Sequence, residues 1–351
     1  MMQREVVRRA FESWQRGEAG ALGTIVAVEG SAYQREGASI FVAPGGTVTG
    51  LISGGCLESE VADEAGHLPL QETRLLRYDT SDESIFGYGM GCPGVIDVLL
   101  EKLPAGDTPL GQFLERFAAG VPVARGVRLD LARDGALQDV AYIPGRGLLG
   151  SLGSQELDAA FLDKVRERLA RARAPEGVRL QDLRGAAEVF AWIVPAEAEC
   201  VIFGATDDAQ PLSRIAQEIG LKVRLIDPRP HLATRERFPA AEVQALPLQE
   251  YPGLRDLGEH SYVVVMGHQV ERDVAALTVA LKSAVPYIGL LSSQGRRESM
   301  ERHLRAQGVL GDGEPAVLHA PAGLAIGSRT PEEIALSIVA ESCAVRRLAT
   351  R

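Results

Sequence analysis

One turn occurs twice in this chain, first as Ala43-Pro44-Gly45-Gly46-Thr47-Val48-Thr49-Gly50 and again, 100 residues later, as Ile143-Pro144-Gly145-Arg146-Gly147-Leu148-Leu149-Gly150. Leu57-Glu58 and Leu157-Asp158 keep the same offset, and a segment of helical character follows each pair. We therefore expect two versions of one strand-turn-helix unit. Where the first copy has Gly54-Gly55-Cys56, the second has Ser154-Gln155-Glu156, so only the first carries a cysteine.

The first copy is built to present that cysteine. Gly54 and Gly55 allow a tight turn and a close approach of the backbone to a ligand. Cys56 then falls at the start of a predicted helix, where the positive end of the helix dipole lowers a thiol pKa and favours thiolate. Glu58 is expected to be a first-turn partner of that dipole rather than a catalyst. The alternative is a structural turn with a buried cysteine.

A second glycine-rich loop, 87–94, contains Gly91 and Cys92 and precedes the apolar stretch 95–101, which predicts a buried strand. Because each loop combines glycines with a cysteine, we expect the two to face one another. Two unrelated loops are the alternative.

Composition narrows the class of protein. A length of 351 residues suggests two domains, and an apolar fraction of 46% supports ordinary globular cores. The net charge of -10 argues against a nucleic-acid partner, which would need clustered Lys and Arg. No uninterrupted apolar stretch is long enough to predict a membrane span.

The cysteines are spaced widely and form no CxxC pair, which argues against a zinc ribbon or a thioredoxin motif. The chain starts with a charged, amphipathic segment rather than a signal peptide. Together these features predict a cytoplasmic protein with reduced thiols.

The second half of the chain has a different pattern. Apolar β-branched stretches at 200–203, 223–226, 262–266 and 287–291 alternate with helical segments, which predicts a doubly wound parallel sheet. We expect an α/β protein with an N-terminal mixed α+β domain over 1–195, containing the strand-turn-helix repeat, and a Rossmann-like domain over 196–351.

The loop after the first of these strands is a poor dinucleotide fingerprint. Gly204 is followed by Thr206 in place of the second glycine, and then by Asp207 and Asp208, whose charges oppose a phosphate. Asp227 does end the second strand, where the ribose-binding acid belongs. The loop therefore argues against NAD(P) binding, while Asp227 is consistent with a nucleotide.

Polar residues also follow the third and fourth strands. His268, Ser292 and Arg296 fall at the carboxyl ends, where open parallel sheets bind ligands. They are candidates for a second site. The alternatives are an ordinary loop histidine and a solvated helix start.

Taken together, the chain resembles the XdhC/CoxI family over nearly its whole length. The resemblance is carried by Gly30-Ser31, Gly37-Ala38, the stretch 50–60, Gly91-Cys92, Val95-Ile96-Asp97-Val98, the Rossmann-like half, Tyr287-Ile288-Gly289-Leu290 and the segment 323–335.

The resemblance implies an accessory protein for molybdenum hydroxylases such as xanthine dehydrogenase. Such a protein binds molybdenum cofactor (molybdopterin), protects it during sulfuration and delivers it to the apo-enzyme. Implied partners are the hydroxylase and a cysteine desulfurase, and a homodimer is expected. The implied cofactor-binding residues are Gly54, Gly55, Cys56, Glu58, Gly91 and Cys92, with the Cys56 sulfur as a contact to molybdenum.

The chain departs from the family pattern in three places. Gly204-Ala205-Thr206-Asp207 replaces Gly-Ala-Gly-His, Cys92-Pro93-Gly94 replaces Cys-Gly-Gly, and Gly267-His268-Gln269 replaces Thr-His-Asp. These departures point to an altered or lost C-terminal site. A maturation chaperone is therefore favoured over a turnover enzyme. The competing hypotheses are an NAD(P)-dependent oxidoreductase and an interaction protein without a small ligand.

Overall fold

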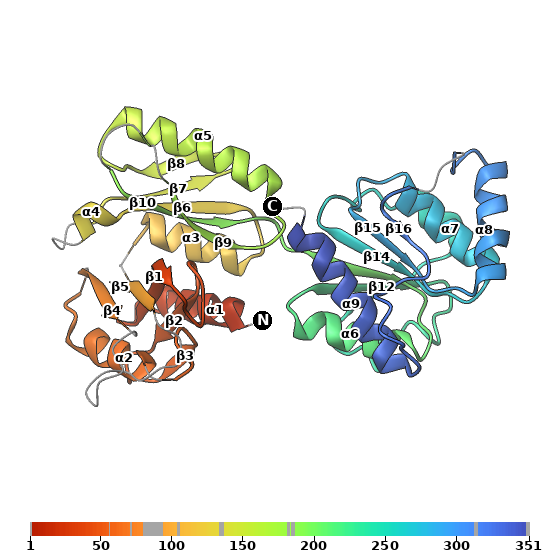
Figure 1. The fold of residues 1–351 in the computed structure, drawn as a ribbon, viewed down its shortest axis with the longest axis horizontal. Coiled ribbons are helices and arrows are strands. Elements are labelled where there is room, and N and C mark those ends of the chain that lie inside the picture. Colours follow the sequence, from red (N-terminus) through yellow and green to blue (C-terminus); the bar gives the residue numbers. More distant parts are fainter. Residues whose placement is uncertain are drawn as a thin grey trace. The chain divides into compact units, whose positions relative to one another are not determined.

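The computed structural model describes residues 2–55, 57–70, 72–79, 94–103, 106–132, 137–180, 183, 187–311 and 315–348. The chain divides into two compact units, Met1–Ala196 and Glu197–Arg351 (Figure 1). Within the described residues, no helix combines the length and the apolar character that a membrane span requires.

The first unit consists of two repeats with the same topology (Figure 1). The first repeat contains α1 Met2–Gln15, β1 Ala21–Gly30, β2 Ser39–Val42, β3 Val48–Gly50, α2 Leu57–His67, β4 Thr73–Asp79 and β5 Gly94–Lys102. The second contains α3 Pro109–Ala118, β6 Val123–Arg128, α4 Leu129–Ala132, β7 Asp139–Ile143, β8 Gly147–Gly150, α5 Gln155–Arg171, β9 Glu176–Leu180 and β10 Val189–Val194.

Both repeats form antiparallel sheets with equivalent strand orders, β3-β2-β1-β5-β4 and β8-β7-β6-β10-β9. The predicted strand-turn-helix repeat is thus confirmed, and the structure extends it to the whole unit. Only the small helix α4 has no counterpart among the described residues of the first copy.

The glycine that ends each repeated turn is required by the backbone. Gly50 has φ +108° and Gly150 has φ +87°. A Cβ on Gly50 would lie 2.6 Å from the Ser39 carbonyl oxygen, and one on Gly150 would lie 2.4 Å from that of Asp139. Both positions therefore exclude a side chain through φ and through space, which explains why the two copies share this residue.

A common core joins the two repeats. One cluster of buried side chains includes Val6 and Leu99 from the first repeat together with Phe113 and Trp192 from the second. The buried Arg125 on β6 donates to Glu101 on β5 at 2.7 and 2.9 Å, and also to Asp139 on β7. Because these carboxylates outweigh the effect of burial, the pKa of Arg125 is raised. The repeats therefore fold against one another as one unit.

The second unit is the predicted Rossmann-like domain, an α/β fold with a parallel sheet in the order β13-β12-β11-β14-β15-β16. Its elements are β11 Glu199–Phe203, α6 Ala209–Glu218, β12 Lys222–Asp227, β13 Glu242–Ala245, the 3-10 helix η1 Leu248–Gly253, β14 Ser261–Val265, α7 Val270–Leu281, β15 Tyr287–Leu290, α8 Gln294–Ala306, β16 Leu318–His319 and α9 Pro331–Leu348.

Helices cover both faces of this sheet, as a doubly wound fold requires (Figure 1). Helices α6 and α9 pack on one face around Cys200 and Ile202, and α7 and α8 pack on the other around Val201 and Phe203. The strand order reverses between β11 and β14, so the carboxyl ends of these two strands flank the position where such sheets bind ligands.

Candidate functional site

The glycine turn of the first repeat is held by one carboxylate. Glu58, buried in the first turn of α2, accepts hydrogen bonds from the Ile52 amide at 2.7 Å and the Ser53 amide at 2.8 Å. It also accepts from the Ser53 hydroxyl at 2.8 Å and from the Gly55 amide at 2.9 Å. The Ser53 hydroxyl oxygen in turn accepts from the Leu57 amide at 2.9 Å, which caps the helix. Both oxygens of Glu58 are therefore used to fix the turn.

This arrangement determines the protonation state of Glu58. Burial raises the pKa of the carboxyl, but the hydrogen bonds from Ser53 and Ile52 outweigh it, and the pKa is lowered overall. A carboxylate that stays ionised and fully hydrogen-bonded is a poor general acid or base. Glu58 was expected to interact with the helix dipole, and in the structure its hydrogen bonds also organise the whole turn.

The second repeat keeps a reduced form of the same clamp. Asp158, in the first turn of α5, accepts from the Leu152 amide and from the Ser151 hydroxyl, both at 2.7 Å. Ser154 caps α5 by accepting from the Leu157 amide at 3.2 Å. Glu58 holds a turn that is followed by a cysteine, and Asp158 holds an equivalent turn that has none. The acid is therefore structural in both repeats.

The glycines of the first turn are open. Gly54 and Gly55 have φ +91° and +121°, a region that side chains rarely adopt. Among the described residues, a Cβ on Gly55 would meet no atom within 4 Å, and one on Gly54 would meet only the ring of Tyr33, at 3.8 to 4.0 Å. Because the Gly55 amide already donates to Glu58, it is not available to an anionic ligand.

Cys56, Gly91 and Cys92 lie outside the described residues, so the expected meeting of the two cysteine loops stays a prediction. The same holds for the Cys56 sulfur as a contact to molybdenum. Within the described residues, no group of three or more His, Cys, Asp or Glu side chains has the geometry to hold a metal ion.

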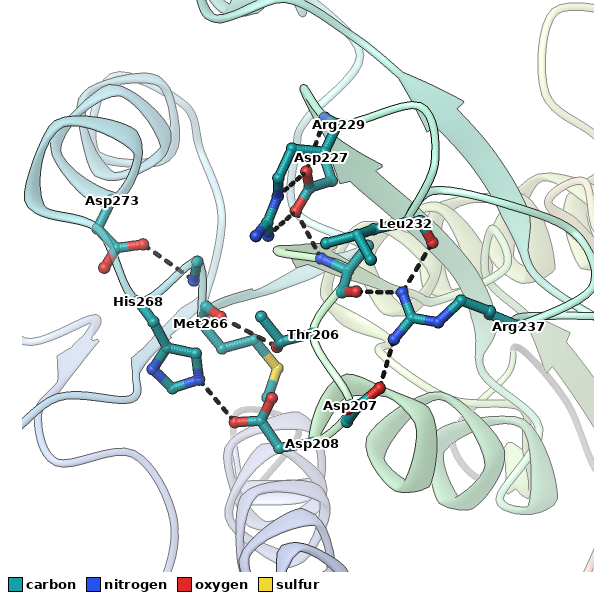
Figure 2. Close-up of polar contacts among 12 residues, drawn as sticks. Thr206, Asp207, Asp208, Asp227, Arg229, Leu232, Arg237, Met266, His268 and Asp273 are labelled. Carbon is teal, nitrogen blue, oxygen red and sulfur yellow. Dashed lines mark hydrogen bonds and ion pairs between the residues drawn. The ribbon is translucent and has the colours of Figure 1, made fainter.

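In the second unit, Asp227 lies at the end of β12 as predicted, but its carboxylate is occupied (Figure 2). It accepts a hydrogen bond from the Ala205 amide at 2.7 Å, and its two oxygens accept from Nε and Nη2 of Arg229 at 2.9 and 2.7 Å. Burial raises the pKa of Asp227, but Arg229 and the Ala205 amide outweigh it and lower the pKa overall, so the carboxylate stays ionised. A ribose hydroxyl would have to displace Arg229, a partner that the sequence prediction missed.

Gly204, the first glycine of the degenerate fingerprint, has a packing role. It has φ +123°, and a Cβ there would lie 2.7 Å from the Met266 carbonyl carbon and 2.8 Å from the Gly267 nitrogen at the end of β14. The glycine therefore permits the ends of β11 and β14 to approach each other. This requirement exists without any ligand.

The aspartates that follow Gly204 each have a basic partner (Figure 2). Asp207 accepts from Arg237 at 2.7 Å, and Asp208 forms a hydrogen bond of 2.8 Å with His268 Nε2. The hydrogen bond to Asp208 is the main cause of the raised pKa of His268. In Asp208 the opposing effect of burial is outweighed, chiefly by that same bond, and its pKa is lowered. Both aspartates are therefore already engaged by side chains of the protein.

The other candidates of the second unit gather at the same edge. Arg296 pairs with Asp273, and its Nη1 lies 3.5 Å from His268 Nδ1. Burial holds the pKa of Asp273 above its usual range despite Arg296. The Ser292 hydroxyl is buried without a hydrogen-bond partner among the described residues. His268, Arg296 and Asp208 therefore lie together at this edge, while Asp227 belongs to a separate ion pair. A ligand site lined by His268, Ser292 and Arg296 stays a prediction.

A large hollow of the described structure, about 1050 Å³, lies between η1, α7 and α8. Tyr251, Leu254, Val274 and Lys282 are among its lining residues. None of the candidate residues lines it. The hollow and the candidate residues are therefore separate features of this unit.

Comparison with known proteins matches both units. Residues 13–79 match the model of the XdhC and CoxI family, and residues 200–342 match that of the XdhC Rossmann domain. The fold is similar to a crystal structure described as a xanthine dehydrogenase from Bacillus halodurans, with a TM-score of 0.79 and 27% identity, covering 99% of this chain and 96% of that one.

Two curated proteins are similar over most of their length. A protein of Bacillus subtilis (strain 168), described as a probable component of xanthine dehydrogenase, is 29% identical over 94% of each chain. The molybdenum cofactor insertion chaperone PaoD of Escherichia coli (strain K12) is 23% identical over 98% of this chain and 88% of its own.

Proposed function

The chain belongs to the XdhC and CoxI family, and from this premise we propose that it binds molybdenum cofactor, protects it during sulfuration and delivers it to a molybdenum hydroxylase of the xanthine dehydrogenase type. A role in molybdenum cofactor maturation is supported by one relative that is named as a molybdenum cofactor insertion chaperone and by another that is named for xanthine dehydrogenase, each similar over most of the chain.

The observation that carries the proposal is the clamped turn of the first repeat. Its single acid, Glu58, is ionised and uses both oxygens to hold three backbone amides and a hydroxyl. Among its described residues, this turn has open glycines, and its one carboxylate is fully engaged in hydrogen bonds rather than free to act as a general base. This suits the holding of a reactive cargo better than turnover, since a chaperone must not consume what it carries.

In this proposal Cys56 follows the open glycines and supplies a soft sulfur ligand toward molybdenum or its terminal sulfur. Gly54, whose amide is not among the donors to Glu58, contributes backbone that a ligand can approach closely. Gly91 and Cys92 contribute from the second glycine-rich loop. A cysteine desulfurase is the proposed sulfur donor, and a homodimer is the proposed assembly.

An NAD(P)-dependent reaction in the second unit is less well supported. Arg229 and the Ala205 amide occupy Asp227, and Asp207 and Asp208 stand where phosphates would need donors. Titration with NADH tests this alternative directly, and saturable binding below the millimolar range would restore it.

The proposal is tested with purified protein and isolated molybdenum cofactor. Equilibrium binding and transfer to the apo-hydroxylase are measured for the wild type, for Cys56→Ala and for Cys343→Ala, a control thiol on α9. We expect the wild type and Cys343→Ala to bind and deliver alike, and Cys56→Ala to lose both. Absence of binding by the wild type would remove the proposed function, whereas equal binding by all three would remove only the role of Cys56.

A further inference from the structure

The duplication of the first unit separates structural features from features that one copy has acquired. The terminal glycine of the turn, the clamping acid and the capping serine occur in both repeats, so they serve the fold. A feature present at only one of two equivalent places is not needed for that fold. The loops between the first two strands of each repeat can be compared in this way.

Tyr33 lies in the loop between β1 and β2 of the first repeat. The corresponding loop between β6 and β7, residues 129–138, contains no aromatic residue in its sequence. Tyr33 is 61% exposed, although a tyrosine ring normally buries most of its apolar surface. The fold of the repeat therefore does not require this ring, and burial does not explain it.

The ring lies beside the glycine turn. A Cβ built on Gly54 would lie 3.8 Å from Tyr33 Cδ2 and 3.9 Å from Cε2, so the ring stands on the open side of Gly54 with room for about one methyl group between them. The turn itself is fixed by Glu58, which binds the Ser53 and Gly55 amides on either side of Gly54. The exposed ring and the open glycine therefore border the same space.

We propose that Tyr33 is a stacking platform for the flat pterin ring system of the cargo, which lies on the exposed part of the tyrosine ring beside Gly54. This inference rests on the proposed function, because it assigns a ligand group to one residue of that site. Stacking on a pre-positioned aromatic ring is tolerant of substituents and costs little conformational entropy, since tyrosine has few rotatable bonds.

The same geometry explains the choice of glycine at position 54. Any side chain there would occupy the space against the Tyr33 ring and would also be strained at φ +91°. A side chain at this position would fill the space beside the ring that the cargo needs. Gly54 is therefore assigned the role of keeping this space open, in addition to its role in the turn.

The test uses two probes, isolated molybdenum cofactor and 6-carboxypterin, whose fluorescence is quenched when an aromatic ring stacks on it. Wild type is compared with Tyr33→Ala, Tyr33→Phe and the control Leu70→Ala, which removes a similarly exposed side chain (68%) from the same repeat. We expect Tyr33→Ala to bind both probes about tenfold more weakly and to lose the quenching. Tyr33→Phe and Leu70→Ala should behave as wild type.

Each outcome has one meaning. Wild-type affinity and quenching in Tyr33→Ala would overturn the stacking role and leave the proposed function standing. Loss of affinity in Tyr33→Phe as well as in Tyr33→Ala would also overturn it, because the hydroxyl and not the ring would then make the contact. Failure of the wild type to bind the cofactor would remove the proposed function and this inference with it. Unfolding curves that match the wild type exclude a folding defect in the variants.

Discussion

Replacing Glu58 by glutamine tests whether the carboxylate holds the glycine turn. One oxygen accepts the Ile52 and Ser53 amides, and the other accepts the Ser53 hydroxyl and the Gly55 amide. In Glu58→Gln the remaining oxygen serves Ile52 and Ser53. The new NH2 group then faces Gly55, and two donors meet. The serine hydroxyl can reverse its role, but a backbone amide cannot.

The expected cost follows from this count. One backbone amide loses a charged acceptor and the other bonds lose their charge assistance, so the free energy of unfolding should fall by about 1.5–3 kcal/mol. Asp158→Asn is the matched control in the second repeat. Its oxygen keeps the Leu152 amide and its NH2 donates to the Ser151 hydroxyl, so the cost should stay below about 1 kcal/mol.

Urea unfolding followed by tryptophan fluorescence measures both variants. The two tryptophans of the sequence, Trp14 and Trp192, belong to the first unit, so the signal reports on that unit alone. The wild-type contribution should be complete above the ordinary glutamate pKa of 4.5 and be lost as pH falls through the lowered folded-state pKa. Glu58→Gln should lack this component of the acid dependence.

Equal costs for Glu58→Gln and Asp158→Asn would refute the reasoning, because only Glu58→Gln leaves a backbone amide without its acceptor and because Glu58 has four charge-assisted bonds to weaken against two in Asp158. An unchanged stability in Glu58→Gln would show that water replaces the carboxylate at no cost. Loss of cofactor binding without loss of stability would instead place Glu58 in contact with the ligand.

Three further predictions concern other positions. Gly150→Ala should lower the unfolding free energy of the first unit by about 2 kcal/mol or more, because its Cβ would lie 2.4 Å from the Asp139 carbonyl oxygen. The control Gly45→Ala, with open space around the new Cβ, should change the unfolding free energy little. Similar values for both variants would contradict the backbone argument. Asp208→Asn should lower the pKa of His268 in an NMR titration. Because the pKa of His268 is raised in the folded state, the stability that the pair contributes should be lost as pH rises through that pKa. An unchanged His268 pKa in the variant would count against the pair. Burial raises the pKa of the Cys200 thiol to about 12, so thiol reagents should label it only as the second unit unfolds, and rapid labelling of the native protein would exclude this environment.

The sequence predicted the elements with a strong pattern and missed those without one. The repeated Pro-Gly turn revealed the duplication, and the apolar stretches located β11, β12, β14 and β15. Strands β9, β13 and β16 were not predicted, because they are short and mostly half-buried or exposed, with no clear apolar alternation. Strand β6 ends at Arg128 and α4 begins within the same apolar stretch, a boundary that apolar content alone does not reveal.

Local spacing places a candidate residue on its element, but it does not reveal the partners that the fold brings to that residue. Asp227 occupies its predicted place at a strand end, but its ion pair with Arg229 is a matter of side-chain direction. Glu58 was expected to interact with the helix dipole, whereas its contacts run backward to residues 52–55. Tyr33, the proposed stacking residue, was not predicted because its proximity to Gly54 joins separate loops and leaves no periodic signal.

The shared core of the two repeats has a consequence for synthesis in the cell. Strand β5 ends at Lys102 and β10 at Val194, so at about 5–20 residues per second the first repeat waits several seconds for its partner. During that interval the apolar side chains that pack against Phe113 and Trp192 in the finished unit lack these partners, and Glu101 lacks the arginine that neutralises it. A nascent chain of this kind is a natural client for ribosome-associated holding factors. Slow codons placed between the repeats would lengthen its exposure and lower the yield of folded protein.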